Sequence, residues 1–131
     1  LYRYITLLLG MKPAEHEFKV MGLAPYAKDK YLKGAYNIFK QHMYVDGINF
    51  KFHTKPKDYY FWFRERLEGI RFDDIAGGLQ KYVEEIMLEY TSNALKKFNA
   101  KRLVYSGGIA MNIKANMMIH IGLFCLKMLL V

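Results

Sequence analysis

A long run of residues from Asp74 to Phe98 constrains the fold of this chain most strongly, because its apolar residues recur every three or four positions. This spacing predicts a long amphipathic helix that buries one face. We expect Asp73 or Asp74 to cap its start, and Lys96 and Lys97 to stabilise its end through the helix dipole. The apolar positions are Ile75, Leu79, Val83, Ile86, Met87, Tyr90, Ala94, Leu95 and Phe98.

The residues that follow this helix predict a strand, a glycine turn and a second helix. Residues 102–105 favour a short strand, Ser106-Gly107-Gly108 a tight turn, and residues 109–118 a helix. A strand that enters a helix through a glycine turn is typical of phosphate-handling units in α/β proteins. The sequence therefore predicts an α/β fold that is rich in helix.

The rest of the chain gives local signals for four helices and one hairpin. Pro25 should end a helix over 15–23, and Asp46-Gly47 is a strong turn signal between strands over 44–45 and 48–52. The other predicted helices cover residues 1–9, 30–42 and 58–67, the last ending at Gly69.

An apolar tail follows the last predicted helix. Residues 117–131 are interrupted only by His120 and Lys127 and fall short of the ~20 residues that span a bilayer. We expect a buried strand or an unnatural terminus there, and no membrane segment. At the other end, residues 1–10 are followed by no cleavage-type site, so we expect no signal peptide. Because the chain also begins with Leu1, it could be a piece of a larger protein.

Composition narrows the function classes. The 53% hydrophobic content excludes a disordered chain, and the single Cys125 excludes a disulfide framework. His16, His42, His53 and His120 lack metal-ligand spacing, so no metal site is predicted. The net charge of +8 fits a solvated basic surface, attraction to a phosphate-bearing small ligand, or nucleic-acid binding.

Two segments are candidate binding sites. The Gly107-Gly108 turn lets a ligand approach the backbone, the following helix aims its N–H groups at the turn, and Asn112 could reach a ligand hydroxyl. The alternative is a plain tight turn. In the second segment, Lys19 beside Gly22 could meet a phosphate, or Glu15 and Lys19 could form an ordinary i,i+4 ion pair.

Three motifs in order carry a family resemblance. They read E-H-E-F-K-V-M-G-L-A-P-Y-A over 15–27, D-I-A-G-G-L-Q-K-Y-V-E-E over 74–85 and Y-S-G-G-I-A-M-N-I-K-A-N over 105–116. The chain resembles carbamoyltransferases of the nodulation-protein-U and antibiotic-biosynthesis type. The first and third motifs are distinctive, and the middle one is supportive.

The resemblance implies an amino-terminal nucleotide domain of the actin/Hsp70-like (ASKHA) ATPase fold. Such enzymes form carbamoyl-adenylate from carbamoyl phosphate and ATP with the help of a metal ion, and then carbamoylate an acceptor hydroxyl. It implies nucleotide contacts for Gly107, Gly108 and Asn112, and, with a looser match, for Glu17, Lys19 and Gly22. The basic charge then needs no nucleic-acid partner.

Departures from the family pattern indicate how much of the family's nucleotide-binding domain this chain contains. The histidine-rich metal motif would precede Leu1, residues 117–131 contain no Pro or Asp, and Ala27 stands where the family usually has Gly. We therefore expect residues 1–131 to be a partial nucleotide-binding domain with no complete second domain and no activity alone. Its partners would be nucleotide, a hydroxyl acceptor and the missing remainder of a cytoplasmic parent.

Two other interpretations stay open. A tRNA threonylcarbamoyl-transferase relative would share the nucleotide fold, and a non-catalytic nucleotide-binding or interaction module would bind ATP without a metal. The acceptor is not readable from these residues.

Overall fold

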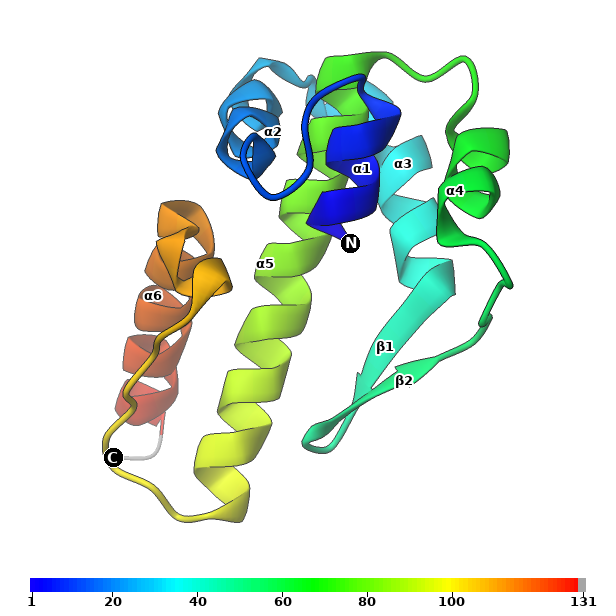
Figure 1. Cartoon of the computed structure of the whole chain (residues 1–131). Coiled ribbons are helices and arrows are strands. Elements are labelled where there is room, and N and C mark those ends of the chain that lie inside the picture. Colours follow the sequence, from blue (N-terminus) through cyan, green and yellow to red (C-terminus); the bar gives the residue numbers. More distant parts are fainter. Residues whose placement is uncertain (130–131) are drawn as a thin grey trace. The chain divides into compact units, whose positions relative to one another are not determined.

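The computed structural model describes residues 1–129, with side chains described through residue 123, as a helix-rich α/β chain with one two-stranded sheet (Figure 1). Its elements are, in order, α1 (Tyr2–Leu8), α2 (Glu17–Leu23), the 3-10 turn η1 (Ala24–Tyr26), α3 (Asp29–His42), β1 (Met43–Asp46), β2 (Asn49–Phe52), α4 (Tyr59–Leu67), α5 (Phe72–Lys97), η2 (Gly108–Met111) and α6 (Ile113–Leu129).

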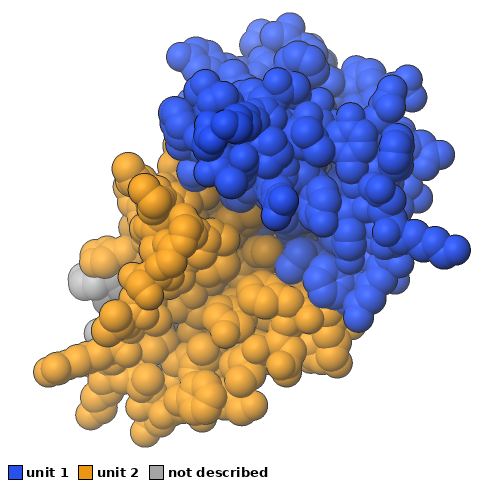
Figure 2. Space-filling view, viewed as in Figure 1, with its two compact units in different colours: residues 1–43, 52–82 blue, residues 44–51, 83–131 orange. Residues whose placement is uncertain are grey.

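The chain divides into two compact units (Figure 2). Unit 1 comprises residues 1–43 and 52–82, and unit 2 comprises residues 44–51 and 83–131. Helix α5 contributes its first part to unit 1 and the remainder to unit 2.

The core of unit 1 forms where the first part of α5 packs against α3. The Phe39 ring lies 5.6 Å from the Phe63 ring and 6.3 Å from the Tyr82 ring, centroid to centroid, and all three side chains are fully buried. The Tyr82 hydroxyl donates a hydrogen bond to the Met43 carbonyl at 2.5 Å, so this ring is anchored at its polar end. A β carbon added to Gly78 would stand 2.7 Å from the Tyr36 backbone nitrogen, which shows how closely the two helices approach.

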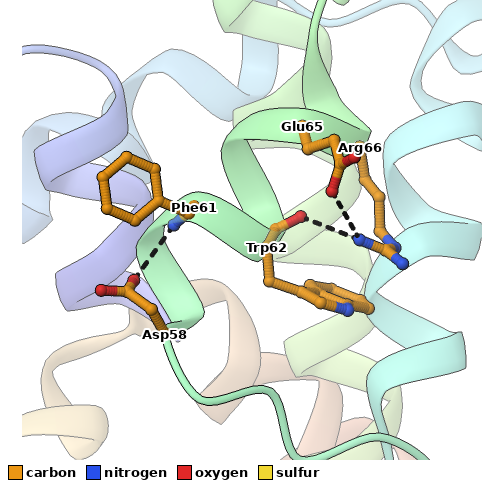
Figure 3. A network of polar contacts seen from close by, with 5 residues as sticks. All are labelled: Asp58, Phe61, Trp62, Glu65 and Arg66. Carbon is orange, nitrogen blue, oxygen red and sulfur yellow. Dashed lines mark hydrogen bonds and ion pairs between the residues drawn. The ribbon is translucent and has the colours of Figure 1, made fainter.

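Helix α4 is fixed at its start by a side-chain cap. The Asp58 carboxylate accepts a hydrogen bond from the Phe61 backbone N–H at 3.1 Å (Figure 3). One turn later the Arg66 guanidinium lies over the Trp62 ring, 4.2 Å from its centroid, and donates to the Trp62 carbonyl (Figure 3). Of the aromatic run that begins this helix, Phe63 is buried and Phe61 is exposed, as expected for a helix with one inward face.

Unit 2 is built from the hairpin tip and the second part of α5, together with η2 and α6. The Phe50 and Tyr90 rings stack at 4.9 Å, and Asn93 donates a hydrogen bond to the Gly47 carbonyl at 2.9 Å. Gly47 has φ +61°, the positive φ that tight hairpin turns favour, and the hairpin predicted from Asp46-Gly47 is present.

Most predicted elements are confirmed, with shifted ends. Helix α5 begins at Phe72, so Asp73 and Asp74 lie in its first turn and do not cap it. The helix predicted over 15–23 begins at Glu17, and Pro25 lies in the η1 turn that follows.

Two predictions near the C-terminal end are wrong. Residues 102–105 form no strand, because the one sheet within residues 1–129 pairs β1 with β2 and offers this segment no partner. Instead of a strand after Met117, helix α6 continues to Leu129. The helix predicted over 109–118 also begins later than expected: η2 follows the glycine turn, and α6 begins at Ile113. Residues 130 and 131 of the predicted tail lie outside the described residues.

Candidate functional site

The glycine turn opens the candidate site in unit 2. Gly107 has φ +97° and ψ 176°, a backbone conformation that residues with a β carbon rarely adopt. Gly108, the first residue of η2, has an ordinary φ, and a β carbon built on it would meet nothing within 4 Å. Both glycines are exposed, so the backbone of this turn is open to approach.

Asn112 has a structural role that the sequence interpretation did not assign. Its side-chain oxygen accepts a hydrogen bond from the Ala115 backbone N–H at 3.1 Å, and the residue is 2% exposed. This is the geometry of an N-cap on α6. Asn112 therefore precedes helix α6 and holds its first turn, whereas the sequence interpretation placed it inside a helix and aimed it at a ligand.

Two buried polar atoms flank the glycine turn in the sequence. The Tyr105 hydroxyl and the Asn116 side-chain oxygen have no hydrogen-bond partner among the described residues. Asn116 uses its amide nitrogen to donate to the Ala110 carbonyl in η2. Burial raises the pKa of Tyr105, so its hydroxyl stays protonated and can donate.

The predicted residues of unit 1 lie on α2 and the turn before it. Glu17 accepts a hydrogen bond from the Ala14 backbone N–H at 2.6 Å, which closes a turn in which Ala14 has φ +68°. The expected Glu15–Lys19 ion pair is wrong, because Glu15 precedes the helix and pairs with Lys12.

Lys19 is left available by this arrangement. Among the described side chains its ammonium forms no ion pair and lies 5.9 Å from the centroid of the exposed Phe18 ring. Three residues on, Gly22 is exposed, and a β carbon built on it would meet nothing within 4 Å. The segment thus offers an unpaired cation and an open backbone position on one short helix.

The predicted site residues fall into two groups, Glu17, Lys19 and Gly22 in unit 1 and Gly107, Gly108 and Asn112 in unit 2. Within the described residues, no group of three or more His, Cys, Asp or Glu side chains could hold a metal ion. None of the helices within residues 1–129 is long and apolar enough to cross a membrane.

Comparison with known proteins gives one family and several distant relatives. The family model described as "Carbamoyltransferase N-terminus" matches residues 1–125. "Uncharacterized protein MJ1058" of Methanocaldococcus jannaschii is 29% identical over 125 residues, covering 89% of this chain and 20% of that protein. "Uncharacterized protein sll1178" of Synechocystis is 29% identical over 132 residues, covering 88% and 21%.

A third relative is named for an enzymatic activity. The "tRNA N6-adenosine threonylcarbamoyltransferase" of Aster yellows witches'-broom phytoplasma is 28% identical over 81 residues, covering 61% of this chain and 30% of that protein. The chain thus spans about a fifth of the length of the first two relatives and less than a third of the third.

Proposed function

Because this chain belongs to the family of carbamoyltransferase N-termini, we propose that it is part of a cytoplasmic O-carbamoyltransferase with an ASKHA nucleotide domain. The parent protein would use ATP and carbamoyl phosphate to form carbamoyl-adenylate and then carbamoylate a hydroxyl of a sugar or secondary metabolite. The part of the reaction that this chain would serve is nucleotide binding. Its partners would be the nucleotide, the acceptor and the rest of the parent polypeptide.

One observation carries the nucleotide site, and it is the open space at Gly108. A glycine is usually required where φ is positive or where a neighbour leaves no room for a β carbon. Neither reason applies to Gly108, whose φ is ordinary and whose surroundings are empty. A ligand that approaches the backbone at Gly108 would explain why glycine stands at this position.

The residues present fit a phosphate-bearing nucleotide. The open turn at Gly107 and Gly108 exposes backbone next to the unpaired hydroxyl of Tyr105 in the sequence. Within unit 2, helix α6 presents the positive end of its dipole after Asn112. A divalent metal would neutralise phosphate charge when bound, and its ligands are expected outside this chain.

Titration of the purified chain with ATP and Mg²⁺ by calorimetry tests the site. We expect Gly108→Val to weaken ATP binding by about tenfold or more, because its side chain fills the space that the ligand needs. Gly34→Ala in unit 1 is the control, since its β carbon would make only an ordinary 3.8 Å contact with the Ile70 side chain. Unchanged binding by Gly108→Val would remove the proposed site.

A second set of variants separates the cap from the ligand. Asn112→Asp keeps the side-chain oxygen that caps α6 and adds a negative charge beside the proposed phosphate position. We expect it to keep the fold, seen by circular dichroism, and to weaken ATP binding. If ATP binds this variant as tightly as the unaltered chain, Asn112 lies away from the phosphates.

Turnover should require the rest of the parent protein. We expect no carbamoyl-phosphate-dependent exchange between ATP and pyrophosphate from residues 1–131 alone. Exchange by this chain would contradict the expectation that a partial domain is inactive.

The threonylcarbamoyl relative favours a second candidate function. The parent protein would then modify tRNA and not a small hydroxyl compound. Labelled carbamoyl transfer by the full-length parent, with tRNA or a small-molecule mixture as acceptor, distinguishes the two. A non-catalytic nucleotide module would show ATP binding that does not depend on Mg²⁺.

A further inference from the structure

A depression lies in unit 1, where residues of η1, of the start of α3 and of the start of α5 line one cavity. Its volume is about 590 Å³, within the range of small-molecule sites. The charged and aromatic residues of its lining are Tyr26, Lys28, Tyr31, Arg71, Asp73 and Asp74. The nucleotide proposal uses none of them.

The buried carboxylate of Asp74 is the first sign of a ligand. Asp74 is 6% exposed, yet among the described residues its carboxylate has no hydrogen bond and no ion pair. Its neighbour Asp73 is fully engaged, with both carboxylate oxygens 3.1 Å from the Arg71 guanidinium. The Asp74 oxygens are not among the fully buried polar atoms that lack a partner, and the residue lines the cavity, so this acceptor-only group can take a donor from a ligand there.

A separate cation in the same cavity is the second sign. The Lys28 ammonium makes no ion pair with a described residue, including Asp74, although both residues line this space. Opposite charges that share a cavity without meeting leave room for a ligand that bridges them. The exposed rings of Tyr26 and Tyr31, at 74% and 56%, line the same cavity and offer apolar faces to the body of such a ligand.

We propose that this cavity binds a small zwitterion of the amino-acid type. The ligand's ammonium group would donate to the Asp74 carboxylate, and its carboxylate would accept from Lys28. An apolar or aromatic side chain on the ligand would rest on Tyr26 and Tyr31. Arg71 pairs with Asp73 and acts on Asp74 only through its charge, so Lys28 and Asp74 are the charged lining residues left without an ion-pair partner among the described residues. One charge of each sign matches a ligand of zero net charge.

Calorimetry with three matched probes tests the proposal on the 131-residue chain. L-phenylalanine carries both charged groups, phenethylamine lacks the carboxylate, and 3-phenylpropanoate lacks the ammonium. We expect L-phenylalanine to bind at least about tenfold more tightly than either analogue, since each charge-assisted hydrogen bond contributes separately. No detectable binding of L-phenylalanine, or equal binding of all three probes, would overturn the proposal.

Two variants assign the ends of the ligand. Asp74→Asn should weaken binding of L-phenylalanine and phenethylamine about tenfold and leave that of 3-phenylpropanoate unchanged. Lys28→Gln should weaken binding of L-phenylalanine and 3-phenylpropanoate about tenfold and leave that of phenethylamine unchanged. Lys33→Gln, an exposed lysine of α3 outside the cavity lining, is the control and should change nothing. Circular dichroism shows whether Asp74→Asn folds. If it does not, Lys28→Gln alone decides, and unchanged L-phenylalanine binding by that variant overturns the proposal. ATP binding is measured in the same samples, so failure here is distinguishable from failure at Gly108.

Discussion

Substituting Gly78 by alanine should loosen the contact between α3 and α5 in unit 1. The added β carbon would stand 2.7 Å from the Tyr36 backbone nitrogen, 2.8 Å from the Ala35 β carbon and 3.0 Å from the Leu32 carbonyl oxygen. Two of these are backbone atoms of α3, so the clash is relieved only if the helices move apart. Overpacking of this kind costs about 1–3 kcal/mol.

The net effect also includes the intrinsic preference of alanine for helix. Replacing a glycine inside a helix stabilises it by up to ~1 kcal/mol. Gly22 on α2 has open space, so Gly22→Ala should show this gain alone and serves as the matched control. We therefore expect Gly78→Ala to lower the free energy of unfolding by about 1–2 kcal/mol, and Gly22→Ala to raise it by about 0.5–1 kcal/mol.

Urea unfolding followed by circular dichroism at 222 nm measures both changes. A stability for Gly78→Ala equal to or above that of the unaltered chain would refute the close packing of α3 on α5. A loss of stability in Gly22→Ala would show that α2 is not open at this position.

Three further predictions rest on single contacts. Asp58→Ala should lower the free energy of unfolding by about 1 kcal/mol in urea, because the cap on the Phe61 N–H is lost, and Asp58→Asn should retain most of it. Desolvation lowers the pKa of the buried His42, although a hydrogen bond to the Thr54 backbone acts in the opposite direction. As the pH falls below about 6.5, the unfolded chain therefore takes up a proton at His42 more readily than the folded chain does. Thermal unfolding should show stability falling as the pH drops from about 7 towards 5, and His42→Phe should flatten this dependence; a parallel profile in the variant would rule His42 out as the cause. Gly47→Ala should lower hairpin stability by about 1 kcal/mol, because its φ of +61° strains a residue with a β carbon, and an unchanged melting temperature would contradict that turn geometry.

The elements that the sequence predicts well are those whose signal is local. The period of α5 and the Asp46-Gly47 turn each lie within one element, and both are present in the structure. The exact start of α5 was not predictable from Asp73 and Asp74, because acidic residues favour the first turn of a helix as well as its cap.

The elements that were predicted wrongly depend on distant partners. A strand over 102–105 requires a neighbouring strand to hydrogen-bond to, and the apolar residues of this segment carry no information about whether one is present. The apolar residues after Met117 fit a buried strand or a helix equally well, since a continuous apolar run has no period to separate them.

Candidate-site residues follow the same division. The cap by Asn112 was detectable, because an asparagine three residues before Ala115 at a helix start is a standard signal. The burial of Asp74 was not, because burial depends on residues distant in the chain, and the cavity it lines also includes Tyr26, Lys28 and Tyr31.

The glycines of the family motifs separate into two physical classes. A β carbon on Gly77 or Gly78, in the middle motif, would collide with residues of η1, α3 or the loop between them, so packing alone requires glycine there. At Gly22 and Gly108, in the outer motifs, φ is ordinary and nothing lies within 4 Å. The middle motif is thus explained by the interior of unit 1, whereas the outer motifs contain glycines that the chain itself does not require. Ligand binding is therefore best tested at the outer motifs, and stability at the middle one.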